Sequence, residues 1–235
     1  MSYKFTFNAD NCCWKNVCGI KETPSCSEHC VRYMKMHYLL YHSLLPEYKW
    51  FPKPLYISEN DPDYNAFITL TEIKNDISNF VKEGKSLYIC SSTNGNGKSH
   101  WAQRILISYL SKIWNTTDFR PRALFIDTET LLQEMKNNSF TEPSEYFRFV
   151  DKHIKDVDLV VWDDFGSSVP TERELKVLFS YINTRELAHK SNIYTSNVFG
   201  ENLKESIGKR LYSRVYKNSI VINFKGTDKR GEKFE

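Results

Sequence analysis

The chain has 235 residues, of which 40% are hydrophobic and 14% aromatic, enough for one packed domain or one domain with a small appendage. No apolar run approaches the length of a transmembrane helix, and the first residues lack the apolar core of a signal peptide. We therefore expect a cytoplasmic protein without a membrane partner. The formal net charge of +3 permits contact with nucleic acid but does not argue for it.

Five of the six cysteines lie in the first thirty residues. In a reducing cytoplasm such a cluster binds metal more often than it forms disulfides. The predicted ligands of one tetrahedral zinc ion are Cys13, Cys18, Cys26 and Cys30. Cys12 is a substitute for Cys13, and His29 is a further candidate. So short a segment needs such a metal for stability; the alternative is a set of free thiols beside a docked helix.

The chain divides into three predicted parts. Residues 1–46 form a cysteine-rich domain, which includes an apolar helix over residues 30–45. Residues 47–84 form a proline-rich linker and then a helix that begins near Asp63 and stops at Gly84. Residues 85–235 form a larger domain, in which strands and helices alternate.

The larger domain is organised around residues 86–98, with the sequence SLYICSSTNGNGK. An apolar strand precedes a glycine turn, and a helix with regularly spaced apolar residues follows. Strand, turn and helix in this order surround the phosphates of a nucleoside triphosphate with backbone N–H groups. Lys98 then reaches the β and γ oxygens, and the Ser99 hydroxyl ligates Mg²⁺. The predicted binding residues of this loop are Asn94, Gly95, Asn96, Gly97, Lys98 and Ser99.

The loop departs from the full pattern at one position. Ser92 stands six residues before the lysine, where the pattern has its first glycine. The alternative interpretation is a surface turn that happens to contain Gly-Lys-Ser, and the strand and helix on either side disfavour it.

A second apolar run, residues 158–164, ends in two carboxylates. Such a run is typical of a strand buried on both faces of a parallel sheet. At the end of this strand Asp163 is expected to hold Mg²⁺ through water, and Asp164 to orient the attacking water. The alternative is that the two aspartates begin a turn or cap a helix.

Further strands are predicted over residues 122–127, 193–197 and 220–224, with helices between them. This alternation predicts an α/β parallel sheet. The fourth strand ends at Asn197, which could hydrogen-bond the lytic water or the γ-phosphate. The alternative role for Asn197 is a helix cap, which is common for asparagine.

Together these motifs resemble the helicase loaders of the DnaC/DnaI type from bacteria and phages, a branch of the AAA+ ATPases that includes the IstB transposition ATPases. The resemblance covers roughly residues 85–231, by motif order and spacing. Residues 94–99 match the Walker A segment, residues 159–166 resemble the Walker B strand with its Asp-Asp-x-Gly ending, and residues 195–197 resemble sensor 1. The implied fold is an AAA+ P-loop parallel sheet flanked by helices, without a C-terminal lid domain.

The resemblance also implies roles for three arginines. Residues 208–214 are similar to the family's Gly-x-Arg-x-x-x-Arg segment. Arg214 would then be an arginine finger that reaches the nucleotide of a neighbouring subunit, with Arg210 as its substitute. Arg230 occupies the position of sensor 2. For each arginine the alternative is a solvated surface charge.

The function implied is that of an ATP-dependent loader of the hexameric replicative helicase, encoded by a phage or a bacterium. By this resemblance the cysteine-rich domain binds the helicase, while the ATPase domain self-associates on ATP and Mg²⁺ and contacts single-stranded DNA. One alternative is an IstB-like transposition ATPase, which the cysteine-rich front end disfavours. Others are a metabolic P-loop kinase and a binding module in which ATP is only structural.

Overall fold

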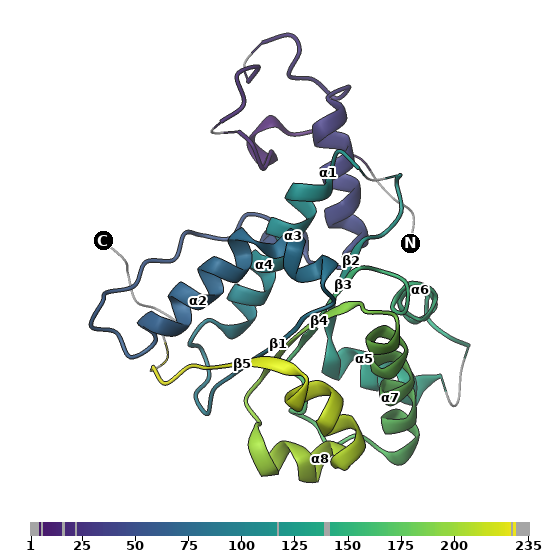
Figure 1. Ribbon diagram of the computed structural model, residues 1–235. Coiled ribbons are helices and arrows are strands. Elements are labelled where there is room, and N and C mark those ends of the chain that lie inside the picture. Colours follow the sequence, from purple (N-terminus) through teal and green to yellow (C-terminus); the bar gives the residue numbers. More distant parts are fainter. Residues whose placement is uncertain are drawn as a thin grey trace.

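The structure, a computed structural model, describes residues 5, 7–15, 17–21, 23–116, 118–138, 142–226 and 228 (Figure 1). The strands are β1 (Ser86–Cys90), β2 (Ala123–Asp127), β3 (Leu159–Asp163), β4 (Ser191–Ser196) and β5 (Ser219–Asn223). The α-helices are α1 (Val31–His42), α2 (Tyr64–Asn75), α3 (Ile77–Lys82), α4 (Lys98–Ile113), α5 (Thr128–Asn137), α6 (Glu145–His153), α7 (Glu172–Leu187) and α8 (Gly200–Tyr212). Short 3₁₀ turns cover Ala9–Asn11 and Glu47–Lys49, and a π-helical turn covers Ser213–Lys217.

The five strands form one sheet in the order β2-β3-β4-β1-β5, and every neighbouring pair is parallel. The predicted parallel α/β sheet is therefore confirmed. β4 lies between β1 and β3, so the carboxyl ends of these three strands meet at one edge of the sheet. In open α/β sheets this edge is where ligands bind.

Alternate residues of each strand face two helical layers, which Figure 1 shows on opposite sides of the sheet. On one face, strand residues such as Leu87 and Val161 pack in a common core with α1, α2, α3 and α4. On the other face, residues such as Tyr88 and Val160 pack with α5, α6, α7 and α8. Each fully buried aliphatic side chain contributes about 1.5–3 kcal/mol to the stability of this arrangement.

The predicted helix from Asp63 to Gly84 is two helices in the structure. Asp76, between α2 and α3, has φ −105° and ψ 23°, and its N–H donates to the Glu72 carbonyl. Its carboxylate accepts a hydrogen bond from Asn79 Nδ2 at 2.7 Å. Aspartate favours such local bonds over the helix interior, and this explains the break.

Two large polar side chains are buried within the sheet region. Trp162, on β3, is fully buried, stacks on Tyr194 at 6.3 Å between ring centroids, and donates from Nε1 to Asn192 Oδ1 at 3.1 Å. Arg185, on α7, is also fully buried. Its guanidinium donates to the carbonyls of Ile154, Val157 and Ser191 and to Asn192 Oδ1, at 2.5–2.8 Å. Arg185 therefore joins α7 to the end of α6 and the start of β4.

The cysteine-rich segment, residues 5–30 where described, consists of turns and the 3₁₀ turn. Trp14 packs edge-on against Trp114, with 5.7 Å between the ring centroids. The Arg32 guanidinium lies 5.1 Å from the centroid of each of these two rings. Because Trp114 follows α4 directly, this cluster joins the segment to the far end of the helix that begins at Lys98. None of the described helices combines the length and apolar character that crossing a bilayer requires.

Candidate functional site

The loop between β1 and α4 has the backbone that its glycines predict. Gly95 has φ +77° and Gly97 has φ +97°, both in the left-handed region that glycine adopts without strain. A Cβ atom at position 95 would also overlap the side chain of Asp228. α4 begins at Lys98, and no side chain among the described residues caps its N-terminus. The first N–H groups of α4 are therefore available to an anion, which the helix dipole also favours.

Lys98 is buried at the base of this loop, with 5% of its surface exposed. Its ammonium donates to the Thr93 carbonyl at 3.0 Å and to Asn96 Oδ1 at 3.2 Å. Asn96 Nδ2 in turn donates to the hydroxyls of Ser91 and Thr93. These hydrogen bonds close the loop around the Lys98 ammonium. A bound phosphate would replace some of the hydrogen bonds that Lys98 makes to the loop.

Ser92, at the position of the missing glycine, is exposed. Among the described residues, the non-glycine positions with positive φ are Leu44, Phe119, Asp164 and His189, so Ser92 does not need the conformation that glycine provides. The bend here comes from Ser91, whose hydroxyl accepts the N–H of Thr93 at 3.1 Å. The serine therefore leaves the geometry of the loop intact.

Asp163 ends β3 and is buried next to the start of α4. Its Oδ1 accepts a hydrogen bond from Thr195 Oγ1 at 2.5 Å, and the Ser99 side chain lies nearby. Burial raises the pKa of the Asp163 carboxyl, while the Thr195 and Ser99 hydroxyls and the positive charge of Lys49 act in the opposite direction. A hydroxyl and a carboxylate side by side are oxygen ligands suited to Mg²⁺.

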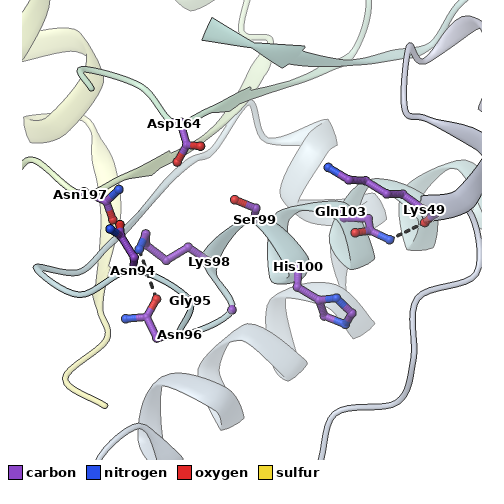
Figure 2. Close-up of a pocket in the computed structure, with 11 residues that line it drawn as sticks. Lys49, Asn94, Gly95, Asn96, Lys98, Ser99, His100, Gln103, Asp164 and Asn197 are labelled. Carbon is purple, nitrogen blue, oxygen red and sulfur yellow. Dashed lines mark hydrogen bonds between the residues drawn. The ribbon is translucent and has the colours of Figure 1, made fainter. Parts of the chain in front are cut away.

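Asp164 and Asn197 face the same cavity from the ends of β3 and β4 (Figure 2). Asp164 has φ +52°, and its N–H donates to Thr195 Oγ1 at 3.0 Å. Asn197 Oδ1 is buried and has no hydrogen-bond partner within the described part of the chain. A buried acceptor without a partner is costly, so this atom indicates a ligand or a water molecule in the cavity.

The cavity has a volume of about 330 Å³. Its lining consists of Lys49, Asn94, Gly95, Asn96, Gly97, Lys98, Ser99, His100, Gln103, Asp164 and Asn197. The structure therefore brings together all predicted residues of the loop with two of the predicted catalytic residues. Asp163 does not line the cavity itself but lies next to Ser99, which does.

A second pocket of about 200 Å³ adjoins the first on the other side of the loop. It shares Gly95, Asn96, Gly97 and His100 with the cavity. Its remaining lining is apolar or aromatic: Leu55, Tyr56, Ile57, Phe67, Trp101 and Phe224. Sequence reasoning missed this pocket because residues 54–57 have the composition of a linker; the apolar Leu-Tyr-Ile run was the only signal.

Lys49 was missed as well. It lies in the 3₁₀ turn after α1, and its side chain reaches the cavity from the side of β2. No motif connects it to Lys98 along the chain.

The two arginines of residues 208–214 do not line this cavity. Arg214 Nε donates to Asn183 Oδ1 at 2.7 Å and pairs with Glu186 at 3.2 Å, and its guanidinium covers Phe179 at 4.8 Å. Arg210 is exposed and lies 5.6 Å from the same ring. Gly208, with φ +77° and ψ 155°, breaks α8 just before them. Arg230 lies outside the described residues.

The cysteines separate into two environments. Cys12, Cys18, Cys26 and Cys30 line one small cavity, and the three other thiols add to the effect of burial in raising the pKa of Cys12. Cys13 lines only a second cavity, which Cys12 also borders; it packs against the main core, and burial raises its pKa to about 12. Within the described residues, no three His, Cys, Asp or Glu side chains converge closely enough to hold a metal ion. The four thiols facing one cavity are a donor set that zinc accepts, but they would have to draw together.

No protein-family model matches the chain. A search of curated proteins also found no match. Solved structures do match. The DnaI structure has a TM-score of 0.59 at 21% identity, over 80% of this chain and 95% of that one. The DnaC helicase loader has a TM-score of 0.55 at 21% identity, over 72% and 94%.

AMPPCP-bound DnaA from Aquifex aeolicus has a TM-score of 0.56 at 21% identity, over 74% of this chain and 51% of that one. The chain thus spans about half the length of that initiator. The chain has the AAA+ P-loop fold. These three structures share its parallel sheet with flanking helices, and at this identity the likeness extends to the fold alone.

Proposed function

We propose that this chain is an ATPase of DNA replication initiation, which loads the hexameric replicative helicase onto single-stranded DNA. The observation that carries the ATPase proposal is that Lys98, Ser99, Asp164 and Asn197 line one cavity beside an apolar pocket, with Asp163 next to Ser99. Loop, acidic strand end and polar strand end have the chemistry that phosphoryl transfer to water requires.

Each side of the site has a proposed role. Lys98 and the first N–H groups of α4 bind the phosphates. Ser99 and Asp163 hold Mg²⁺, which neutralises charge on the phosphate oxygens. Asp164 orients the attacking water. Asn197 also contacts the attacking water. Its Nδ2 donates to a phosphate, and its Oδ1, which has no partner among the described residues, accepts a hydrogen bond from the water.

The apolar pocket is the proposed site of the nucleotide base. It touches the loop through Gly95 and Gly97, so a base there and phosphates over the loop belong to one molecule. Tyr56, Phe67 and Phe224 supply aromatic and apolar surface for stacking. This pocket favours a nucleotide over inorganic polyphosphate.

The proposed self-association places Arg214 at the nucleotide of a neighbouring subunit, with Arg210 as its substitute. Neither arginine lines the cavity of its own chain, as a residue acting between subunits requires. Arg214 would have to exchange Glu186 for a phosphate, and Arg210 is already exposed. Arg230 stays a proposed sensor 2.

The cysteine-rich part, residues 1–46, is proposed to bind a structural zinc ion and to grip the helicase. Cys12 joins Cys18, Cys26 and Cys30 at one cavity, so we assign it as the fourth ligand in place of Cys13. Residues 47–84 then join this part to the ATPase domain, residues 85–235.

Helicase loading as the specific task rests on likeness of fold and motif. The DnaC structure is that of a helicase loader, and one DnaA structure holds AMPPCP and single-stranded DNA. Transfer of these partners to this chain is the part of the proposal that needs experiment most.

The test is ATP hydrolysis by the purified chain, alone, with single-stranded DNA, and with a hexameric replicative helicase from its source. We expect stimulation by DNA or by the helicase, with loss of activity in Lys98→Ala and in Arg214→Ala. Hydrolysis that responds to neither, and that Arg214→Ala leaves unchanged, would contradict loading while keeping the ATPase. A chain that binds no nucleotide would contradict both.

A further inference from the structure

We propose that Lys49 binds the terminal phosphate of the nucleotide, as a second lysine supplied by the strap, residues 46–57, that joins α1 to α2. This inference rests on the proposed nucleotide site and extends it. Lys49 would discriminate a nucleoside triphosphate from a diphosphate. It would also connect the occupied site to the part of the chain that precedes the ATPase domain.

The backbone of Lys49 is fixed against α4. Its carbonyl accepts a hydrogen bond from Gln103 Nε2, and Gln103 lies one helical turn after Ser99. The next residue, Trp50, is buried and donates from Nε1 to the Leu45 carbonyl at 2.8 Å. The Lys49 side chain therefore extends from a backbone that these contacts fix in place.

The strap makes a second contact with α4 at Lys53. The Lys53 carbonyl accepts from Arg104 Nη1 at 2.7 Å and lies 3.2 Å from His100 Nε2. His100, Gln103 and Arg104 thus form one face of α4 that carries the strap. The strap therefore lies against α4, the helix that begins at the phosphate loop.

Among the described residues, the Lys49 ammonium at the cavity has two aromatic neighbours and no hydrogen-bond acceptor or carboxylate partner. It lies 5.5 Å from the centroid of Phe125 and 5.9 Å from that of Tyr48. At this end of the site Asp164 lines the same cavity, and Asp163 lies near enough for the Lys49 charge to lower its pKa. The positive charge acts on Asp163 from a distance.

Figure 2 shows Lys49 extending toward Ser99 from the side opposite Lys98. Lys98 belongs to the loop that would enclose the phosphates, and it lines the cavity from that side. Lys49 approaches from the acidic end of β3, where the last phosphate of a triphosphate lies in the proposed site. A diphosphate would leave this ammonium without a phosphate oxygen, beside Asp163 and Asp164. A triphosphate offers it an oxygen, and a charge-assisted hydrogen bond is among the stronger polar contacts.

The experiment compares Mg²⁺-dependent affinity for AMPPCP and for ADP in the full chain, by calorimetry. Lys49→Met keeps the stem over Phe125 and removes the charge. We expect AMPPCP affinity to fall roughly tenfold or more, as the loss of one charged hydrogen bond implies, while ADP affinity changes by less than about threefold. Lys49→Arg restores the preference for AMPPCP.

Lys53→Met is the matched control, because Lys53 is an exposed lysine of the same strap that does not line the cavity. It should bind both nucleotides as the unmodified chain does. Equal losses for AMPPCP and ADP in Lys49→Met, or no loss, would overturn the role of Lys49 and leave the nucleotide site standing. Failure of the unmodified chain to bind either nucleotide would overturn the site itself.

Discussion

The sheet region and the cysteine-rich segment are held together by different means. Strands β1, β3 and β4 are buried along nearly their whole length, and two helical layers cover them. In the described part of the chain, no residue before Tyr33 is fully buried. The segment makes mainly local turn bonds, with long-range contacts such as Asn8 N–H to Tyr33 Oη at 3.1 Å and the Trp14–Trp114 pair. Burial stabilises the first region, whereas the second has little burial to stabilise it, which is why a structural zinc ion is proposed for it.

The largest effect should come from breaking the interior of the sheet region. Arg185→Met removes four buried hydrogen-bond donations and leaves three carbonyls without them. We expect the free energy of unfolding to fall by at least about 3 kcal/mol, since each buried unsatisfied group costs about 1–3 kcal/mol. Denaturant titration measures this change in the free energy of unfolding. Lys176→Met, an exposed change on the same helix, should cost under about 0.5 kcal/mol; a similar cost for both would contradict the structural role of Arg185.

The next effect concerns the site that the sheet region carries. Lys98→Ala should lower nucleotide affinity about 100-fold, because a buried cation that bonds the phosphates is lost. Lys112→Ala, at the other end of α4, is the control and should bind normally. Calorimetric titration measures both, and normal binding by Lys98→Ala would place the nucleotide elsewhere.

The cysteine-rich segment should respond to metal removal while the sheet region does not. Cys12→Ala should weaken zinc binding at least about tenfold, measured by chelator competition, while Cys13→Ala keeps the affinity and stoichiometry of the unmodified chain. Chelation should make residues 5–30 sensitive to protease and leave nucleotide binding unchanged. Zinc loss in Cys13→Ala with retention in Cys12→Ala would restore the assignment made from spacing.

The smallest effect tests the junction between the two regions. Trp114→Ala removes one ring from the Arg32 cluster and should cost about 1 kcal/mol of docking free energy. Hydrogen exchange of residues 5–30 should speed up, with that of β1 and β3 unchanged. Asn115→Ala, at the exposed next position, is the control. Equal exchange in all three proteins would show that the segment is not held at Trp114.

Much of the site was predictable because its residues follow strands directly. Asp163 ends the apolar strand β3 and Asn197 directly follows β4, and the carboxyl ends of parallel strands share an edge. The apolar pocket and Lys49 were not predictable, because Lys49 and part of the pocket come from the strap and their positions depend on how it lies along α4. The break at Asp76 is a local effect, and the periodicity of apolar residues across it concealed it.

By itself, the sequence determined the phosphate loop, the five strands and the acidic and polar residues at their ends, because turn chemistry and side-chain periodicity are local properties. The tertiary structure decided the strand order that puts β4 between β1 and β3. It also decided which of Cys12 and Cys13 faces the other thiols, and that Lys49 enters the cavity. These outcomes depend on contacts between segments far apart in the chain. The free energy of such contacts comes from packing, which spacing along the chain does not record.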